Sequence, residues 1–213
     1  MKLNVNDCRQ MVCFIADKVI ENKSLLTEMD SAIGDGDHGI GMSGGMAKVK
    51  SQIDQLDTDN AYQIFKISGN VMLMSMGGAS GILFGSMFMA GAKGAAKELG
   101  TVDLAEMFAA GLAAVKTRGK ASVGDKTMVD ALEPAVTAMK DYSGASMPEM
   151  MKNARDAAYK GMESTKSMVA KFGRAKTLME RAVGHQDAGA TSVWIIFSAM
   201  YEWACGNSKF HSS

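Results

Sequence analysis

Apolar residues recur at intervals of three and four along almost the whole chain, and this spacing predicts an all-α fold. The first stripe consists of Cys8, Met11, Val12, Ile15, Val19 and Ile20. Because these positions share one face of a helix, residues 5–21 can form a helix that packs against a core. The same spacing returns in later segments, and no segment shows the alternation of a half-buried strand.

Eight helices are expected in total. After the first, they cover about 42–56, 61–76, 81–99, 103–118, 126–141, a long stretch that begins at 147, and 188–204. Pro134 falls inside the sixth and predicts a kink or a restart, because proline lacks the N–H that the helix needs. Pro148 opens the seventh, where proline in the first turn is favoured.

The composition agrees with helices packed in one domain that spans residues 1–213. Hydrophobic residues make up 47% of the 213, and the chain has 20 Met but only two Pro. Methionine fills irregular gaps between helices, whereas sandwiches of strands usually carry more aromatics and turn residues. The 23 basic and 23 acidic residues balance, so we expect neither a nucleic acid nor a membrane as a partner.

The sequence shows no sign of export or of a membrane anchor. Cys8 and Cys13 are spaced neither as metal ligands nor as a disulfide and are expected to be buried apolar residues. The N-terminal segment lacks the basic and apolar parts of a secretory signal. The apolar stretch 193–200 ends close to Glu202, and a membrane helix needs about 20 apolar residues. We therefore expect a soluble, cytoplasmic protein.

Three carboxylates stand close together in the sequence, at Asp30, Asp35 and Asp37. Glycines occupy positions 34, 36, 39 and 41 around them. Three such charges repel one another, and a bound hard divalent cation offsets the free-energy cost of this repulsion. Magnesium binds in this way, through a few carboxylates together with waters and substrate phosphates. The alternative is a solvated acidic loop, but that interpretation does not explain the glycines.

Other ligand-binding motifs are incomplete or missing. The spacing GxGxxG occurs at 34–39, but the strand and βαβ unit that it requires are not expected here. The same loop lacks the glycine and the glutamate of a calcium-binding loop. The pattern GxxxxGK[ST] does not occur in the chain, so a nucleotide site here is not a Walker loop.

Three more glycine-rich junctions lie between helices, at 77–85, 119–124 and 184–189. Turns that lead into a helix N-terminus hold anions, because free backbone N–H groups point outward there. In the first of these junctions, Ser80 either caps the helix or binds a phosphate. After the second, Lys126 either meets a phosphate or lies on the surface. Near the third, Arg174 either binds a phosphate or forms a surface ion pair, and His185 is either structural or functional.

Taken in order, the motifs resemble the L subunit of dihydroxyacetone kinase, the nucleotide-binding family of glycerone kinases. They are Gly34-Asp-Gly-Asp-His-Gly39, Gly77-Gly-Ala-Ser-Gly81, Gly124-Asp-Lys-Thr-Met128 and Gly184-His-Gln-Asp187. The resemblance covers essentially the whole chain. It implies a closed barrel of eight antiparallel helices with nucleotide bound at one end. It also implies ADP or ATP and two Mg²⁺ ions as cofactors.

The resemblance also implies which residues form the site. The metal ligands correspond to Asp30, Asp35 and Asp37. The nucleotide contacts correspond to His38, Gly39, Ile40, Gly41, Ala79, Ser80, Gly119, Met128, Arg174, Asp187, Ala188 and Gly189. No catalytic residue beyond the metal ligands is implied in this chain, because the family binds its acceptor on a histidine of a separate K subunit.

The implied function is that of the ADP-binding subunit of a phosphotransferase-system-dependent dihydroxyacetone kinase. In such an enzyme a phospho-donor M subunit rephosphorylates the bound ADP. The phosphoryl group then passes to dihydroxyacetone on the K subunit. The chain would be a phosphotransferase that works by positioning and by neutralising charge. A transcription regulator and a second copy of the chain are further candidate partners.

Two alternatives stay open beside this function. One is a kinase subunit that exchanges free ATP and acts on another ketose or a sugar alcohol; the other is a nucleotide-occupied regulatory module. The sequence also departs from the family at two places near the nucleotide. Ala188 stands where proline is common, and Lys176-Thr177 stands where Ser-Tyr is common. Because proline rigidifies a turn, Ala188 is expected to loosen the cover over the nucleotide.

Overall fold

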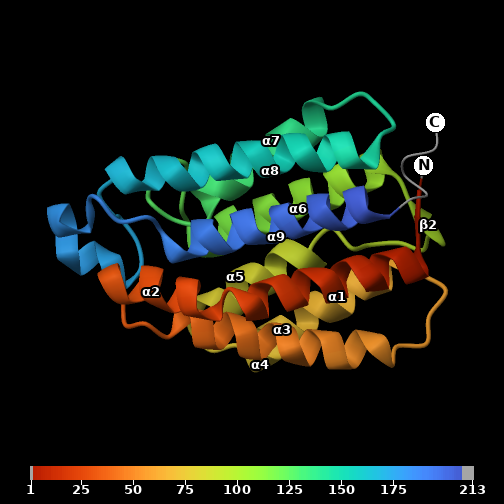
Figure 1. Ribbon diagram of the computed structural model, residues 1–213, viewed down its shortest axis with the longest axis horizontal. Coiled ribbons are helices and arrows are strands. Elements are labelled where there is room, and N and C mark those ends of the chain that lie inside the picture. The colour runs from red at the N-terminus through yellow and green to blue at the C-terminus, as the bar shows by residue number, and fades with distance from the viewer. Residues whose placement is uncertain (1, 208–213) are drawn as a thin grey trace.

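Helices make up most of the computed structural model, which describes residues 2–207 (Figure 1). The described part contains nine α-helices: α1 (Val5–Glu21), α2 (Lys23–Ile33), α3 (His38–Asp54), α4 (Ala61–Ser75), α5 (Gly78–Met89), α6 (Thr101–Gly119), α7 (Val129–Asp141), α8 (Met147–Ser164) and α9 (Ala188–Gly206). Two short 3₁₀ segments, η1 (Thr165–Ser167) and η2 (Arg174–Ala182), connect α8 to α9. The prediction of an all-α fold is confirmed.

The structure has one α-helix more than the eight expected, because residues before the acidic loop form α2. Asn22 separates α2 from α1. Its side-chain amide donates to the carbonyl of Lys18 at 2.8 Å, and its own φ of −90° and ψ of 13° leave the helical path. Only Leu26 and Ile33 of α2 are buried. The apolar stripe that identifies a packed helix is therefore almost missing from this segment.

Two helix boundaries and one pair of short strands also differ from the expectation. The helix expected to reach residue 99 ends at Met89, since glycines follow it and Gly94 has a φ of 100°. Residues 98–99 instead form β2 (Glu98–Leu99), which pairs antiparallel with β1 (Leu3–Asn4). The expectation that the chain has no strand was therefore wrong, because these two short strands form. The helix expected from 126 begins at Val129, because Gly124 and Lys126 both have positive φ.

Pro134 lies inside α7, which continues through it without the restart that the sequence allowed. Proline leaves the carbonyl four residues earlier, that of Asp130, without a helical donor. Gly161 of α8 packs directly against this carbonyl. The proline therefore leaves without a helical donor a carbonyl at which Gly161 lets α7 and α8 approach closely.

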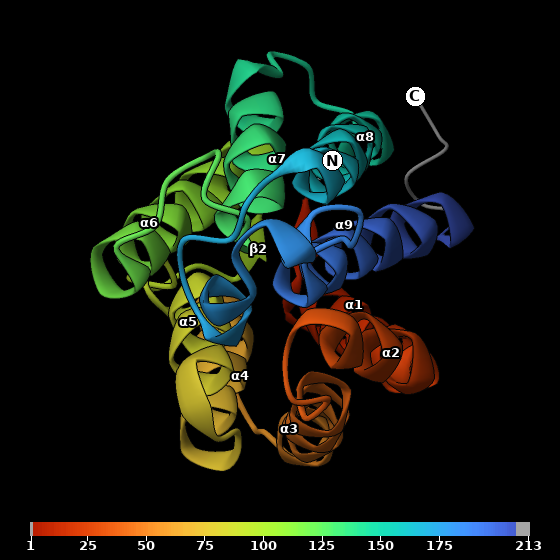
Figure 2. The ribbon, with the colours of Figure 1, turned by 90° about the vertical axis from the view of Figure 1, so that its left-hand side faces the viewer.

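The long helices pack in sequence order around the molecule (Figure 2). From α3 to α9 each helix packs against the next, α3 packs against α1, and α9 returns to α1. From α2 onward, consecutive helices run in opposite directions, whereas α2 continues from the end of α1 (Figure 1). As a result, the connections 34–37, 76–77, 120–128 and 165–187 all lie at one end of the molecule, whereas β1 and β2 lie at the other.

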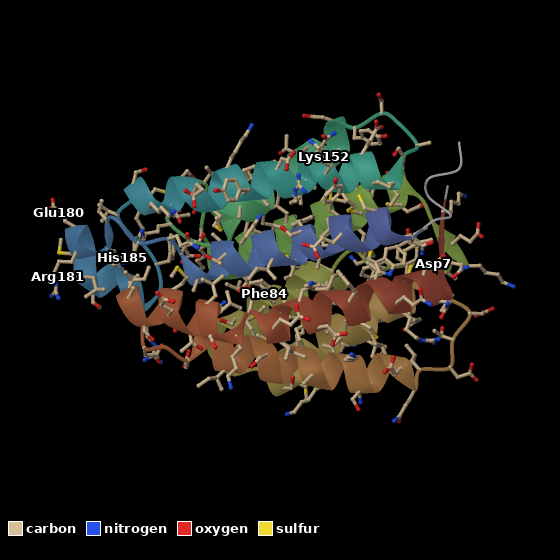
Figure 3. All side chains as sticks on the ribbon, viewed as in Figure 1. Asp7, Phe84, Lys152, Glu180, Arg181 and His185 are labelled. Atoms are coloured by element: carbon tan, nitrogen blue, oxygen red, sulfur yellow. The ribbon has the colours of Figure 1, made fainter. Side chains whose placement is uncertain are left out.

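Side chains fill the space between the helices. One continuous core holds most buried methionines together with Phe84, Phe88, Phe108 and Phe197. Phe84 lies inside the bundle in Figure 3, and the rings of Phe108 and Phe197 lie 5.4 Å apart. Cys8 is buried in this core as expected, whereas Cys13 is only half-buried. None of the helices that the structure describes is long and apolar enough to cross a membrane.

Candidate magnesium and nucleotide site

The three aspartates of the acidic loop lie together in space. Asp30 is in the last turn of α2, Asp35 is in the connection, and Asp37 directly precedes α3. Each offers a carboxylate oxygen, and these oxygens all lie within 4.8 Å of one another. We call these three residues the acidic cluster. Three carboxylates at this spacing fit the hard oxygen ligands that Mg²⁺ prefers.

The backbone of the connection explains why the cluster forms. The amide of Gly34 donates to the carbonyl of Asp30 at 2.5 Å and ends α2. Gly36 has a φ of 77°, a conformation that glycine adopts without steric cost. The chain therefore turns sharply between Asp35 and Asp37. The amide of His38 then donates to Oδ2 of Asp30 at 3.2 Å and holds the start of α3 against the end of α2.

The electrostatics of the cluster favour a cation. Partial burial raises the pKa of Asp37, and the charges of Asp35 and Asp30 raise it further. Arg174 of η2 opposes this shift. Its Nη1 lies 2.5 Å from Oδ2 of Asp35, and its side chain is largely exposed. Of the two roles expected for Arg174, the structure therefore contains the surface ion pair, and this pair lies at the cluster itself.

The imidazole of His38 joins three helices beside the cluster. Its Nδ1 lies 3.2 Å from Oγ of Ser80 on α5, and its Nε2 lies 2.8 Å from Oγ of Ser192 on α9. The ring is buried, and burial lowers the pKa of His38. Ser80 does not cap α5, whose cap residue is Gly77. The sequence did not point to Ser192, although its hydroxyl is fully buried against this ring.

The expected nucleotide contacts gather at three helix N-termini at the same end of the molecule (Figure 2). The first turns of these helices contain His38, Gly39, Ile40 and Gly41 in α3, Ala79 and Ser80 in α5, and Ala188 and Gly189 in α9. First-turn amides lack helical acceptors, and the helix dipole adds partial positive charge there. Anionic phosphate groups are therefore favoured at this end.

The remaining expected contacts border the same region. Gly119 ends α6 close to Leu83 of α5, and a side chain at Gly189 would lie 3.2 Å from Cβ of Met128. Asp187 caps α9, since its Oδ2 accepts the amide of Ala190 at 2.7 Å. Burial raises the pKa of Asp187 to about 7, although that amide acts in the opposite direction. The structure thus brings Met128 and the 187–189 turn into contact.

Lys126 fits neither of the alternatives drawn from the sequence. Its side chain is buried, and its Nζ donates to the carbonyl of Thr165 at 2.6 Å and to the carbonyl of His185. Burial lowers the pKa of Lys126.

The side chain of His185 is exposed at the same end of the molecule (Figure 3). The loop before α7 is ordered by Asp130, whose carboxylate accepts the amides of Gly124 at 2.6 Å and Thr127 at 2.7 Å.

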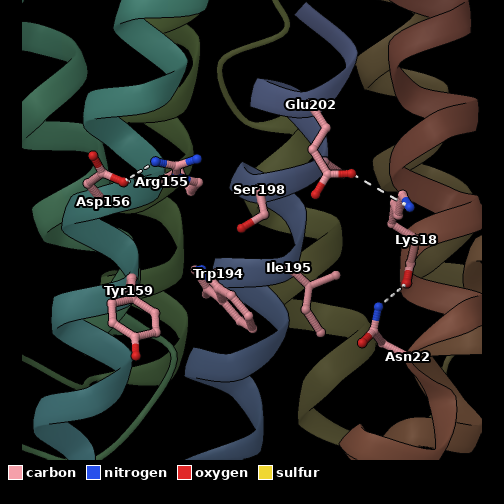
Figure 4. A pocket seen from close by; sticks show the side chains of 10 residues that line it. Lys18, Asn22, Arg155, Asp156, Tyr159, Trp194, Ile195, Ser198 and Glu202 are labelled. Carbon is pink, nitrogen blue, oxygen red and sulfur yellow. Dashed lines mark hydrogen bonds and ion pairs between the residues drawn. The ribbon is translucent and has the colours of Figure 1, made fainter. Parts of the chain in front are cut away.

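A groove on the side of the bundle lies apart from these residues (Figure 4). It is formed by α1, α8 and α9, and the rings of Tyr159 and Trp194 lie 5.7 Å apart in it. Lys18 and Glu202 approach to 3.6 Å across it. None of the expected site residues lines this groove, so it is not the site that the motifs predict.

Comparison with known proteins identifies the family. The model of the DAK2 domain matches residues 32–202, which include two aspartates of the acidic cluster and the four glycine-containing motifs at 34–39, 77–81, 124–128 and 184–187. The chain belongs to the DAK2-domain family. This DAK2 chain is 42% identical to "PEP-dependent dihydroxyacetone kinase 2, ADP-binding subunit DhaL" of Listeria innocua over 187 residues, or 85% of this chain and 87% of the relative. The resemblance to the L subunit is confirmed.

Two further similarities concern a second bacterial subunit and a solved structure. The DAK2 chain is 40% identical to the corresponding ADP-binding subunit DhaL of Escherichia coli K12, over 82% of this chain and 85% of that subunit. It also matches the crystal structure of the dihydroxyacetone kinase of C. freundii in complex with AMP-PNP and Mg²⁺, with a TM-score of 0.73 and 28% identity. The match covers 91% of this chain and 33% of that kinase, so the DAK2 chain spans about a third of its length.

Proposed function

We propose that this chain is the ADP-binding subunit of a phosphotransferase-system-dependent dihydroxyacetone kinase. The observation that carries the proposal is the acidic cluster, whose oxygens meet within 4.8 Å at the end of the molecule where three helix N-termini also gather. Four relatives that are 37–42% identical over most of their length are named as such subunits. The chain is accordingly a phosphotransferase that acts on an alcohol group.

The acidic cluster would hold two Mg²⁺ ions, which supply positive charge to the phosphates of a bound nucleotide. Asp30 is already oriented by the amide of His38. Asp35 would hold metal in place of its contact with Arg174, and the guanidinium of Arg174 would then be free to bind a phosphate. The first turns of α3, α5 and α9 and residues Gly119 and Met128 complete the pocket for ADP or ATP. Catalysis in this chain is then positioning and charge neutralisation.

The proposed architecture is a closed barrel of eight antiparallel helices, α1 and α3–α9, in a single domain over residues 1–213. Sequential packing and the return of α9 to α1 support it. Residues 1 and 208–213 of that domain lie outside the described part. Nucleotide binds at the end where the acidic cluster lies. The opposite end, with β1 and β2, has a structural role.

The chain would act with a K subunit that holds dihydroxyacetone on a histidine and with a phospho-donor M subunit in the cytoplasm. The names of the relatives support the first of these, because a subunit that is named for ADP binding implies another for the acceptor. A transcription regulator and a second copy of the chain are further candidate partners. A nucleotide-occupied module without phosphoryl transfer is excluded if the chain supports transfer to a ketose in the presence of a K subunit.

The first experiment is to purify the chain without added nucleotide, denature it and assay the supernatant for ADP. We expect about one ADP per chain, and its absence together with no calorimetric binding of Mg-ADP or Mg-ATP would contradict the proposal. Asp30→Ala should abolish metal-dependent retention. Asp54→Ala is a matched control, because Asp54 lies at the far end of α3, outside the cluster.

A second candidate differs in acceptor and in nucleotide exchange. Relatives named L-erythrulose kinase and L-erythrulose 1-kinase are 32% and 33% identical to this chain, which spans about a third of each. Together with Ala188 and Lys176-Thr177, these names favour a free-ATP kinase subunit for a larger ketose. Activity with ATP and no phospho-donor protein, with rapid exchange of the bound nucleotide, would select this candidate over the first.

A further inference from the structure

We propose that Lys126 is a positioning residue for the nucleotide site, where its buried ammonium anchors both ends of the segment that covers the acidic cluster. This inference rests on the proposed function. The segment in question is residues 168–184, between η1 and the turn before α9, and we call it the cover segment. It lies at the end of the molecule where the acidic cluster lies (Figure 2).

The ammonium of Lys126 joins two backbone positions far apart in sequence. It donates to the carbonyl of Thr165, just before the cover segment, and to the carbonyl of His185, just after it. The side chain is only 2% exposed. Its φ of 59° is a left-handed conformation that lysine rarely adopts. A buried charge and an unfavourable backbone conformation persist only where the surrounding structure requires them.

The same point is connected to the turn that begins α9. The amide of Asp187 donates to Oγ1 of Thr165 at 3.0 Å, and the amide of Gly184 donates to the carbonyl of Lys166 at 2.7 Å. Asp187 in turn caps α9. The position of the 187–189 turn, which is expected to contact the nucleotide, therefore depends on the backbone that Lys126 holds.

Two ion pairs also hold the cover segment, and the cation of each is exposed. Lys171 pairs with Asp125 at 2.7 Å, and Arg174 pairs with Asp35 at 2.5 Å, with side chains that are 62% and 70% exposed. Asp125 is buried, and its carbonyl also accepts the amide of Lys171 at 3.2 Å. Of the two ion pairs, the one between Arg174 and Asp35 therefore opens more easily, because exposed ion pairs contribute little. A buried ammonium that loses its acceptors has no water to replace them, so its contacts persist. Nucleotide can therefore leave by opening of the cover segment at Arg174, while Lys126 stays in place at the two ends of this segment.

The test replaces Lys126 with methionine in the full chain, and Lys120→Met is the matched control. Lys120 lies in the same loop with a similar φ of 56°, but its side chain is exposed. Release of a fluorescent ADP analogue is measured with Mg²⁺ by competition with excess ADP. Tryptic cleavage within 171–181, which contains four basic residues, is measured in the nucleotide-free protein.

We expect Lys126→Met to release the analogue at least about tenfold faster than wild type, because hydrogen bonds of a charged donor are lost. We also expect faster cleavage within 171–181 at unchanged helix content. Lys120→Met should match wild type in both. A folded Lys126→Met with wild-type release and wild-type cleavage would overturn the proposal.

A second variant decides the matter if Lys126→Met does not fold. Thr165→Val keeps the carbonyl that Lys126 binds but removes the hydroxyl that accepts the amide of Asp187. Faster release of the analogue would support the link between Thr165, at the start of the cover segment, and the 187–189 turn. Unchanged release and unchanged cleavage would overturn the proposal. If wild type itself retains no analogue, the proposed function fails, and the cleavage rates still decide whether Lys126 anchors the cover segment.

Discussion

The guanidinium of Arg174 lies 2.5 Å from the carboxylate of Asp35 and joins the cover segment to the acidic cluster. The arginine thus provides the positive charge that a metal ion would bring to the same carboxylate. In the proposed function, it would compete with metal for Asp35 and would meet the phosphates of the nucleotide after metal displaced it. Under the proposed function, the two roles predicted for this side chain, surface ion pair and phosphate ligand, would be successive states of one residue.

Replacing Arg174 with alanine should separate these two effects. Without nucleotide, the affinity for Mg²⁺ should rise by up to about fivefold, because the lost pair is exposed and contributes at most about 1 kcal/mol. With Mg²⁺ present, the affinity for ADP should fall. Calorimetric titrations with Mg²⁺ and with Mg-ADP measure both, and Arg174→Lys, which keeps the charge, is the control. Unchanged binding of both ligands would show that the arginine plays no part in the site.

Neutralising one carboxylate of the cluster should stabilise the metal-free protein. The pKa of Asp37 is raised by partial burial and by Asp35 and Asp30, so its charge opposes folding at neutral pH. Asp37→Asn should raise the Tm without Mg²⁺ by no more than about 3 °C, since the carboxylate keeps most of its contact with solvent and the gain in stability stays below about 1 kcal/mol. Mg²⁺ should then raise the Tm of wild type but not of the variant. A lower Tm for metal-free Asp37→Asn would contradict the repulsion.

The half-buried carboxyl of Asp187 at the start of α9 predicts a pH dependence of stability. Burial raises the pKa of Asp187 to about 7, above the value of about 3.9 in an unfolded chain. The folded protein therefore binds this proton more tightly, so ionisation of Asp187 costs stability above about pH 7. The cost disappears as the pH falls through 7 toward 4.

Asp187→Asn keeps the cap oxygen and removes the charge. The variant should be more stable than nucleotide-free wild type at pH 8 by roughly 1–2 kcal/mol, a discounted figure because the side chain is only half-buried. The difference should shrink toward pH 5. Urea unfolding of both proteins at several pH values measures it, and a difference that is constant with pH would assign the effect to the cap instead of the charge.

The parts of the fold that local spacing determines could be predicted from the sequence. Apolar stripes such as that of α1 identify packed helices, because a helix that buries one face has apolar residues at intervals of three and four. The helix α2 was not predicted, because it buries only Leu26 and Ile33 and so lacks an apolar stripe. The late start of α7 depends on a positive φ at Lys126, and no residue preference marks such a conformation for lysine.

The acidic cluster was predictable for a similar reason, since its three aspartates lie within eight residues and their glycines permit the turn. The partners of its neighbours were not. Ser192 meets His38 from 154 residues away in the chain, and Lys126 meets carbonyls rather than a motif. Every residue has a backbone carbonyl, so the sequence does not show which carbonyls accept from a side chain. A buried lysine with such partners therefore cannot be told from a surface lysine in the sequence.

Ala188→Pro should restore a rigid entry to α9 and slow the release of nucleotide. Ala188 is the first helical residue, where proline fits and needs no N–H partner. Asp187 before it has a ψ of 131°, which the residue before a proline adopts readily. We expect about 0.4–1 kcal/mol of added stability and a longer lifetime of bound ADP. Thermal unfolding and analogue release measure the two, and a destabilised variant would show that the ring does not fit this buried position.

The contact between α7 and α8 gives the sharpest test of the packing. A methyl group at Gly161 would overlap the carbonyl of Asp130, the one that Pro134 leaves without a helical donor. Alanine is favoured over glycine inside a helix by about 1 kcal/mol, so propensity alone predicts stabilisation. Overlap with a backbone atom should prevail, because neither helix can shift without disturbing the core, and overpacking typically costs about 1–3 kcal/mol.

Gly44→Ala is the matched control, since Gly44 is exposed within α3 and a methyl group there would meet open space. We expect Gly44→Ala to stabilise the chain by about 0.5–1 kcal/mol and Gly161→Ala to destabilise it. Urea unfolding of both variants measures the opposite signs. Because Asp130 also holds the amides of Gly124 and Thr127, Gly161→Ala should in addition loosen the loop that carries Lys126. Stabilisation by both alanines would mean that α7 and α8 can separate freely, and the base of the cover segment would then lack the rigid support that the structure assigns to it.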